Sequence, residues 1–208
     1  MDAHQLNATY AAELLQRQHR LQAEARQVLA DLDLMTALGR LGQAEHVGSS
    51  VSGLMVWRDL DVGVRCSQPT ADRVFDTLRP IMTHPRVHEV LYREETGSRS
   101  PSGQAADQRY YFVVRYVTVA GHPWKIDISV WRTNAPRNQL SHVAYLAAHL
   151  TDEMRLAILW IKDVWHRLPT YPDEVSGTDI YTAVLEHGLR TPEQFATYLQ
   201  ERGHPPGA

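Results

Sequence analysis

The sequence predicts an α+β protein: a mixed β-sheet with helices packed on it, a long helix before it and an all-helical region after it. Residues 1–38 have helical spacing, residues 87–131 hold consecutive strand-like runs, and residues from 139 onward are again helical in pattern. The 208 residues, 43% hydrophobic and 22% charged, suit one sizeable core with a helical annex. We therefore expect two domains, residues 1–137 and 138–208.

The first element is one long helix. Its apolar residues recur at intervals of three, four and seven, with Gln, Arg and Glu between them. Gly39 stands where such a helix would end, because glycine readily takes the left-handed conformation that closes a helix. The apolar positions are Leu14, Leu21, Ala25, Val28, Leu29 and Leu32.

Strands and helices then alternate. We expect a short strand over residues 44–49, a helix from Ser50 to Met55, and a second strand from Asp59 to Cys66. The next helix runs from Arg73 to Met82, and Thr70 is its N-cap, since a threonine oxygen can accept a bond from the first helical turn.

Three strand-like runs follow: Val87 to Glu94, Arg109 to Ala120, and Trp124 to Trp131. Residues 96–107, between the first two runs, have the Gly, Ser and Pro content of a loop. The tight turn Gly121-His122-Pro123 joins the last two runs into a hairpin. Consecutive strands after an alternating start indicate a mixed sheet.

The C-terminal region is predicted to contain helices alone. Thr151 and Thr178 are candidate N-caps, and Gly188 ends the helix that Thr178 begins. Thr191 and Gln194 form a capping box with a proline at the first helical position. The predicted helices cover residues 140–150, 154–165, 179–187 and 191–202.

Composition excludes several classes of protein. A single cysteine, Cys66, rules out an internal disulfide and a multi-cysteine zinc site, which fits a reducing cytoplasm. The N-terminus lacks the basic start and apolar middle of a signal peptide. No apolar run approaches the roughly 18 residues that span a bilayer. We therefore expect a cytoplasmic protein without a membrane partner.

The net charge of −3 is unevenly distributed along the chain. Residues 39–137 carry 13 Arg and Lys against 10 Asp and Glu, whereas residues 138–208 carry 5 against 9. A mildly cationic central part suits a triphosphate, but a nucleic-acid binder usually has a larger basic excess. Long polynucleotide partners are therefore disfavoured.

One short segment carries the most specific pattern. The turn Gly48-Ser49 is followed, after nine residues, by Asp59 and Asp61. Side chains alternate along a strand, so both carboxylates point to one side while Leu60 points into the core. Two adjacent carboxylates repel each other unless a cation lies between them, and Mg²⁺ takes one or two carboxylates together with substrate phosphates. The segment therefore predicts a magnesium site.

This segment resembles the signature of polymerase-beta-type nucleotidyltransferases: a hydrophobic residue, Gly-Ser, a spacer, then Asp-hydrophobic-Asp-hydrophobic. That family also needs a third acid on a later strand, and Asp127, flanked by two isoleucines, offers one. The resemblance covers roughly residues 40–132. It implies a Mg²⁺-dependent enzyme in which Asp59, Asp61 and Asp127 are the catalytic residues and the metal ligands, with room for two ions. Asp127 would join a second metal or act as base on the acceptor hydroxyl.

Five further residues are candidates for binding the nucleotide. Gly48 and Ser49 would hold the β and γ phosphates through backbone N–H groups and the serine hydroxyl, because a side chain at Gly48 would block close approach. Arg58 and Lys125 could neutralise phosphate charge, but strand alternation directs each away from its neighbouring acid, so a surface role stays equally open. Ser129 shares the face of the third acid and could touch nucleotide or acceptor.

Three functions remain open. The resemblance favours transfer of a nucleoside monophosphate from an NTP, such as ATP, to a hydroxyl of a small molecule, with release of pyrophosphate. Antibiotic-modifying members of that family likewise follow the core with a helical region. The alternatives are a toxin-like enzyme that modifies RNA or a protein, and a non-catalytic module that binds nucleotide or a partner. Retention of three acids favours an enzyme, and the modest positive charge favours a small acceptor.

Overall fold

The computed structural model describes residues 6–135, 145–146 and 148–203. Contacts within the chain divide it into two compact units. The helical unit comprises Met1–Arg20, Leu54–Val56 and Tyr145–Ala208, and the sheet unit comprises Leu21–Gly53 and Trp57–Ala144. The domain boundary expected between residues 137 and 138 lies outside the described residues.

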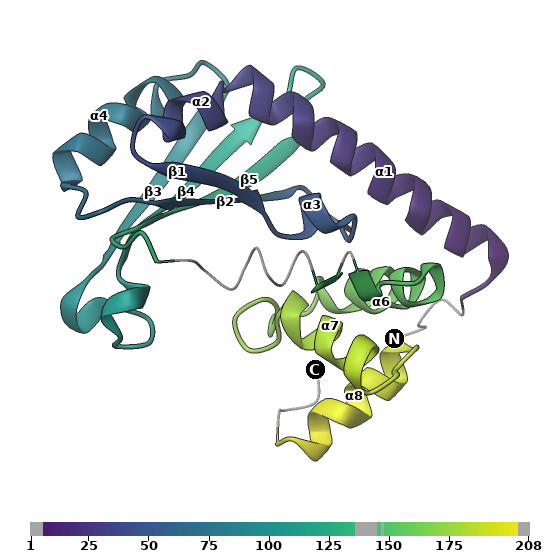
Figure 1. Ribbon diagram of the computed structural model, residues 1–208. Helices are drawn as coiled ribbons and strands as arrows, with labels where there is room; N and C mark the ends of the chain where they lie inside the picture. Colours follow the sequence, from purple (N-terminus) through teal and green to yellow (C-terminus); the bar gives the residue numbers. More distant parts are fainter. Residues whose placement is uncertain (1–5, 136–144, 147, 204–208) are drawn as a thin grey trace. The chain divides into compact units, whose positions relative to one another are not determined.

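The sheet unit is built on five strands in the order β1-β2-β5-β4-β3 (Figure 1). β2 and β5 run parallel, and the other neighbouring pairs are antiparallel. The mixed sheet predicted from the sequence is therefore confirmed, and so is the hairpin that joins β4 to β5. The strands are β1 Gln43–Val47, β2 Asp59–Arg65, β3 Val87–Glu95, β4 Arg109–Val117 and β5 Pro123–Trp131.

The two faces of this sheet differ in chemistry. Strand alternation places Leu60, Ile126 and Phe112 on one face, where all three are fully buried. Helix α4 covers this face, because the ring of its Phe75 packs edge-on against that of Phe112, with 5.5 Å between the centroids. The opposite face carries the odd-numbered residues of β2 and β5, and these include the three predicted acids.

The predicted N-terminal helix is in fact two helices. α1 spans Ala8–Asp31 and α2 spans Leu34–Gly39. Asp33 separates them with a φ of 44°, a left-handed conformation that aspartate adopts more readily than most residues. The helix ends at Gly39 as predicted, but Gly39 is its last residue and the cap is Arg40 in a right-handed conformation, not a left-handed glycine. Residues 8–20 of α1 belong to the helical unit and residues 21–31 to the sheet unit.

The helix predicted from Ser50 to Met55 is shorter than expected. α3 spans only Ser49–Ser52, because Gly53 takes a left-handed φ of 71° and ends it. By contrast, α4 covers Ala71–Met82, and its predicted cap is confirmed by the bond that the Thr70 hydroxyl accepts from the Arg73 N–H. The predicted loop contains two short 3₁₀ turns, η1 Gly97–Arg99 and η2 Ala105–Asp107.

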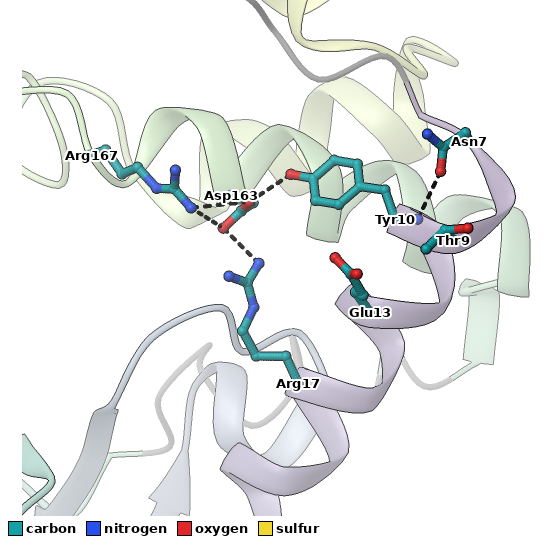
Figure 2. Close-up of a pocket in the computed structure, with 7 residues that line it drawn as sticks. All are labelled: Asn7, Thr9, Tyr10, Glu13, Arg17, Asp163 and Arg167. Atoms are coloured by element: carbon teal, nitrogen blue, oxygen red, sulfur yellow. Dashed lines mark hydrogen bonds and ion pairs between the residues drawn. The ribbon is translucent and has the colours of Figure 1, made fainter.

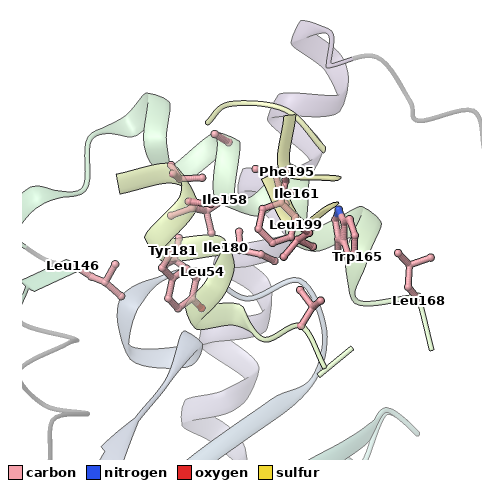
Figure 3. Packing of buried hydrophobic residues seen from close by; sticks show 14 residues of the cluster. Leu54, Leu146, Ile158, Ile161, Trp165, Leu168, Ile180, Tyr181, Phe195 and Leu199 are labelled. Carbon is pink, nitrogen blue, oxygen red and sulfur yellow. The ribbon is translucent and has the colours of Figure 1, made fainter. Parts of the chain in front are cut away.

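Among the described residues of the helical unit, three C-terminal helices pack around one apolar core (Figure 3). The rings of Trp165 and Phe195 meet edge to face in this core, with 5.1 Å between centroids. Leu54 enters the core from the segment after α3, and the buried Lys162 ammonium donates to its carbonyl at 2.8 Å. The helices are α6 Asp152–Trp165, α7 Gly177–Glu186 and α8 Pro192–Glu201.

Local capping signals in this unit are mostly confirmed. Thr151 caps α6, and Thr191 forms the predicted capping box of α8. The cap predicted at Thr178 is wrong: α7 begins earlier, with Ser176 as its N-cap in a box with Asp179. The helix predicted over residues 140–150 lies partly outside the described residues. Within the described part of the chain, no helix is long and apolar enough to cross a membrane.

Candidate active site

The three predicted acids lie on two neighbouring parallel strands. Asp61 of β2 is in register with Asp127 of β5, and Asp59 is in register with Lys125 two residues earlier. Adjacent strands run about 4.8 Å apart, and residues in register share a face. Asp59 and Asp127 are mostly buried, with 15% and 16% of their side chains exposed. The structure therefore brings all three acids to one face of the sheet.

Gly48 lies directly against one of these acids. Its φ of 79° is left-handed, and a Cβ atom at this position would stand 2.3 Å from Oδ2 of Asp61. Both the backbone conformation and the space therefore require glycine here. Ser49 follows as the first residue of α3. The Gly-Ser turn and the Asp-x-Asp pair, separated in sequence, thus form one structural feature.

A small cavity of about 120 Å³ opens beside the acids. Asp61, Asp127 and Ser129 all line it, as the shared face predicts. Ligand sites for whole small molecules are usually about 300–1,000 Å³, so this cavity by itself has room for an ion and phosphate oxygens rather than for a complete nucleotide. The other lining residues are Val47, Val62, Gly63, Arg109 and Tyr111.

Lys125 points toward the acids, contrary to the expectation from strand alternation. Its ammonium lies 2.6 Å from Oδ2 of Asp127 and 3.4 Å from Oδ1 of Asp59. The prediction was wrong because Lys125 and Asp127 are two residues apart, and such residues share a strand face. Burial alone would lower the pKa of Lys125, but the charges of Asp59 and Asp127 outweigh burial and raise it above its ordinary value. The lysine is therefore held as a cation.

Arg58, by contrast, is not brought to the acids. Its Nε donates to Glu24 of α1 at 2.7 Å, and Arg58 does not line the cavity. Glu24 also binds the His122 ring in the turn between β4 and β5. Burial raises the pKa of Glu24, but these two partners more than offset that effect and lower the pKa below its ordinary value. The observed role of Arg58 is to tie the start of β2 to α1.

Two residues beside the acids were not predicted from the sequence. Arg109 donates from Nη1 to the Ser129 hydroxyl at 2.9 Å, and its guanidinium stacks 4.5 Å from the centre of the Tyr111 ring. Burial, and then the charge of Asp127, raise the pKa of Tyr111 well above its ordinary value. The predicted hairpin could have identified both residues. Pairing its two strands outward from the turn places Tyr111 opposite Ser129 and Arg109 opposite Trp131, on the same face as the acids.

Comparisons with known proteins relate this geometry to a fold. No family model matches the chain, and no curated protein matches its sequence. Solved structures do match. The chain resembles the RNA terminal uridylyl transferase Cid1 with 17% identity and a TM-score of 0.55, covering 86% of this chain and 53% of that one. It resembles a cytoplasmic RNA terminal U-transferase with 16% identity and a TM-score of 0.51, covering 84% and 51%.

The fold is that of a nucleotidyltransferase. A second structure of Cid1, described as a poly(U) polymerase, also matches, with 14% identity and a TM-score of 0.51 over 86% of this chain and 55% of that one. The chain thus spans about half the length of the solved structures that it matches. The low identities mean that the likeness extends to the fold alone.

The carboxylate oxygens on this face of β2 and β5 fit a divalent cation. All three acids offer carboxylate oxygens, the ligands that Mg²⁺ prefers. Oδ1 of Asp127 is buried and makes no hydrogen bond with any described residue. Yet no group of three His, Cys, Asp or Glu side chains among the described residues is already arranged to hold a metal. The Lys125 ammonium lies between Asp59 and Asp127, so one or two carboxylates are the accessible ligand set.

The helical unit contains a larger cavity of about 500 Å³ that no sequence pattern indicated (Figure 2). Its wall includes the buried Asp163. The carboxylate of Asp163 accepts a hydrogen bond from the Tyr10 hydroxyl at 2.5 Å and forms an ion pair with Arg17 at 2.6 Å. Arg167 adds bonds to both oxygens of the same carboxylate, at 3.1 and 3.2 Å. Both oxygens of Asp163 are therefore engaged by the protein itself. This cluster joins the start of α1 to α6.

Proposed function

We propose that this protein transfers a nucleoside monophosphate from an NTP to an acceptor hydroxyl and releases pyrophosphate. The observation that carries the proposal is the register of Asp61 with Asp127 on adjacent parallel strands, with Gly48 pressed against Asp61. The nucleotidyltransferase fold supports the same reaction class. Fold alone does not specify function, so the proposal rests on this group of side chains.

In this proposal Asp59 and Asp61 hold Mg²⁺, and Asp127 completes the ligand set or a second metal site. Bound Mg²⁺ neutralises phosphate charge and stabilises the attacking and leaving oxygens of an in-line displacement. Gly48 lets the backbone of the turn pack directly against the Asp61 carboxylate, where a Cβ atom would overlap Oδ2, so the backbone N–H groups of the turn can reach phosphate oxygens beside that acid. Ser49, at the start of α3, offers its hydroxyl to the same phosphates.

Asp127 is also the candidate base for the acceptor hydroxyl. One of its oxygens is held by Lys125, and the other, Oδ1, is buried without a hydrogen-bond partner among the described residues. A carboxylate oxygen in that state can take the proton of an acceptor hydroxyl, provided that the hydroxyl comes within hydrogen-bond reach. Ser129 and Arg109, at the cavity wall, would orient the acceptor or the nucleotide.

The acceptor is the open part of the proposal. A small-molecule hydroxyl is the first candidate, because residues 39–137 carry only a small basic excess and the arginines of the sheet face are paired with acids. An RNA 3′ hydroxyl is the second candidate. It is favoured by the fold likeness to two RNA terminal uridylyl transferases, whose sequence identity to this chain is at most 17%.

The experiment is a pyrophosphate-release assay with each labelled NTP, Mg²⁺, and panels of small hydroxylated acceptors and short RNAs. We expect one NTP to be turned over, and Asp61→Asn and Asp127→Asn to lower the rate by at least about 100-fold. Glu89→Gln is the matched control, since Glu89 is an exposed acid of β3 whose ion-pair partner is Arg115, 3.9 Å away. Full turnover by Asp61→Asn would overturn the proposal. Product analysis separates the two acceptor classes.

A further inference from the structure

A positive charge of the protein already occupies the acid site. The Lys125 ammonium lies within 3.4 Å of one predicted metal ligand, Asp59, and within 2.6 Å of another, Asp127. Its side chain is mostly buried, with 28% exposed, so solvent screens this charge only in part. Any divalent cation that binds Asp59 or Asp127 must therefore approach a cation already bound there.

The other basic residues on this face are engaged elsewhere. Arg65 pairs with Glu45 at 2.6 Å, Arg109 pairs with Glu95 at 2.5 Å, and Arg115 lies 3.9 Å from Glu89. The first pair joins β2 to β1, the other two join β4 to β3, and none of them includes one of the three acids. Lys125, on β5, has the acids themselves as partners. Its position thus reflects the charge of the acid site and not a general pairing of the sheet face.

The chemistry of a lysine suits a temporary partner. Its ammonium is a compact point charge on a flexible four-carbon chain, whereas an arginine fork would fix a carboxylate in two parallel bonds. A triphosphate in the cavity that Asp61 and Asp127 line would bring several negative charges next to Asp127, the carboxylate that the Lys125 ammonium contacts. An ammonium that leaves Asp59 and Asp127 can therefore find phosphate oxygens without leaving the site. That exchange would free two carboxylates at the moment when the nucleotide arrives.

We propose that Lys125 is a displaceable counter-ion: it keeps divalent cations off Asp59 and Asp127 until a nucleotide triphosphate arrives, and then transfers its ammonium to the phosphates. This inference rests on the proposed nucleotidyl transfer and adds an order of events to it. Free metal binds weakly, and metal and nucleotide bind tightly only together. Lys125 does not touch the metal but controls its access to Asp59 and Asp127, and it contacts the nucleotide directly through the phosphates.

The first test measures Mn²⁺ affinity without nucleotide, by electron paramagnetic resonance of the free ion. Lys125→Gln removes the charge, and we expect it to bind Mn²⁺ about tenfold more tightly than the wild type, because an opposing charge a few ångströms away is gone. Arg115→Gln is the matched control. Arg115 is in register with Lys125 on β4, on the same face, but pairs with Glu89 instead, so the affinity of this variant should stay unchanged.

The second test measures the affinity for a non-hydrolysable NTP analogue at saturating Mn²⁺. Lys125→Gln should bind it about tenfold more weakly, because the ammonium that pairs with phosphate is absent. Lys125→Arg keeps the charge and should retain weak binding of Mn²⁺ alone. Opposite changes in the two affinities are the signature of the exchange. A lysine that merely supported the fold would weaken both, and that result would overturn the inference.

Loss of stability in Lys125→Gln does not prevent the test. Removing the ammonium leaves two neighbouring carboxylates unneutralised, so this variant should unfold at a lower temperature without metal and show a larger Mn²⁺-induced rise than the wild type. An equal rise in both proteins would contradict the inference. The proposed function fails in a different way, when Asp61→Asn keeps wild-type Mn²⁺ affinity in the presence of nucleotide.

Discussion

Two carboxylates of this protein, the buried Asp163 in the helical unit and the mostly buried Asp127 in the sheet unit, are held in opposite ways. Asp163 receives the Tyr10 hydroxyl and two arginines, which engage both of its oxygens (Figure 2). Asp127 accepts from the Lys125 ammonium on Oδ2 and interacts with the Tyr111 hydroxyl, whereas its Oδ1 is buried without a hydrogen-bond partner among the described residues. The first carboxylate is saturated by its own protein, and the second retains capacity for a ligand.

The partners explain the difference. Burial by itself raises the pKa of Asp163, but Tyr10 and the two arginines outweigh burial and lower the pKa below its ordinary value. Planar guanidinium groups hold a carboxylate in a fixed geometry, whereas a lysine can exchange partners. A carboxylate with every oxygen bonded by the protein therefore supports structure, whereas a carboxylate with an oxygen that no described residue bonds can accept a ligand.

The largest expected effect is a difference in the free energy of unfolding between variants of Asp163 and Asp127. Asp163→Asn leaves two arginines without a carboxylate and should lower the free energy of unfolding by about 3 kcal/mol. Asp127→Asn removes an acid that lies beside two others and should change it by less than about 1 kcal/mol. Urea unfolding of both variants measures the difference. Equal losses of stability would break the distinction between a structural and a functional acid.

A medium effect is expected at alkaline pH. Burial and Asp163 raise the pKa of Tyr10 from 10.0 to about 12 in the folded protein. The protonated phenol is favoured by folding, so its stabilisation is complete below pH 10.0 and is lost as the pH rises through about 12. Tyr10→Phe should therefore be less stable than the wild type at pH 8, by about 1–2 kcal/mol, with the gap closing above pH 10.

The control for this pH dependence is Tyr145→Phe, which alters an exposed tyrosine of the same unit. Thermal melts of the three proteins between pH 8 and pH 11.5 give the comparison. A constant gap between the wild type and Tyr10→Phe over this range would show that the phenol proton is not tied to Asp163.

The smallest effect ranks the two arginines of the Asp163 cluster. Arg17 has 30% of its side chain exposed and Arg167 has 61%, so solvent screens the second ion pair more strongly. Arg17→Met should cost about 1 kcal/mol of stability, and Arg167→Met less than about 0.5 kcal/mol, in the range of exposed pairs. The reverse order in denaturant unfolding would contradict the assigned geometry.

Local signals in the sequence predicted much of the fold. Thr70, Thr151 and Thr191 were identified as helix caps because each capping bond spans only three residues. The break at Asp33 was missed because the apolar periodicity continues across it, and the cap at Ser176 was placed two residues late. Such boundaries depend on backbone conformations that periodicity does not encode.

The site was less predictable because its contacts join distant segments. The shared sheet face of Asp59, Asp61 and Asp127 could be predicted from motif and alternation, but the places of Arg109 and Tyr111 needed the hairpin register. The Tyr10–Asp163 bond joins residues that are 153 positions apart, and neither lies in a recognisable pattern. Long-range pairing of this kind is a property of the folded chain rather than of any segment.

In the proposed function, Asp59 and Asp61 bind a triphosphate through a divalent cation. The most direct measurement is equilibrium binding of a labelled NTP with and without Mg²⁺ to the wild type and to Asp59→Asn and Asp61→Asn. We predict that Mg²⁺ tightens binding to the wild type by at least about tenfold, or 1.4 kcal/mol, and leaves both variants unchanged. The same Mg²⁺ dependence in all three proteins would contradict the account.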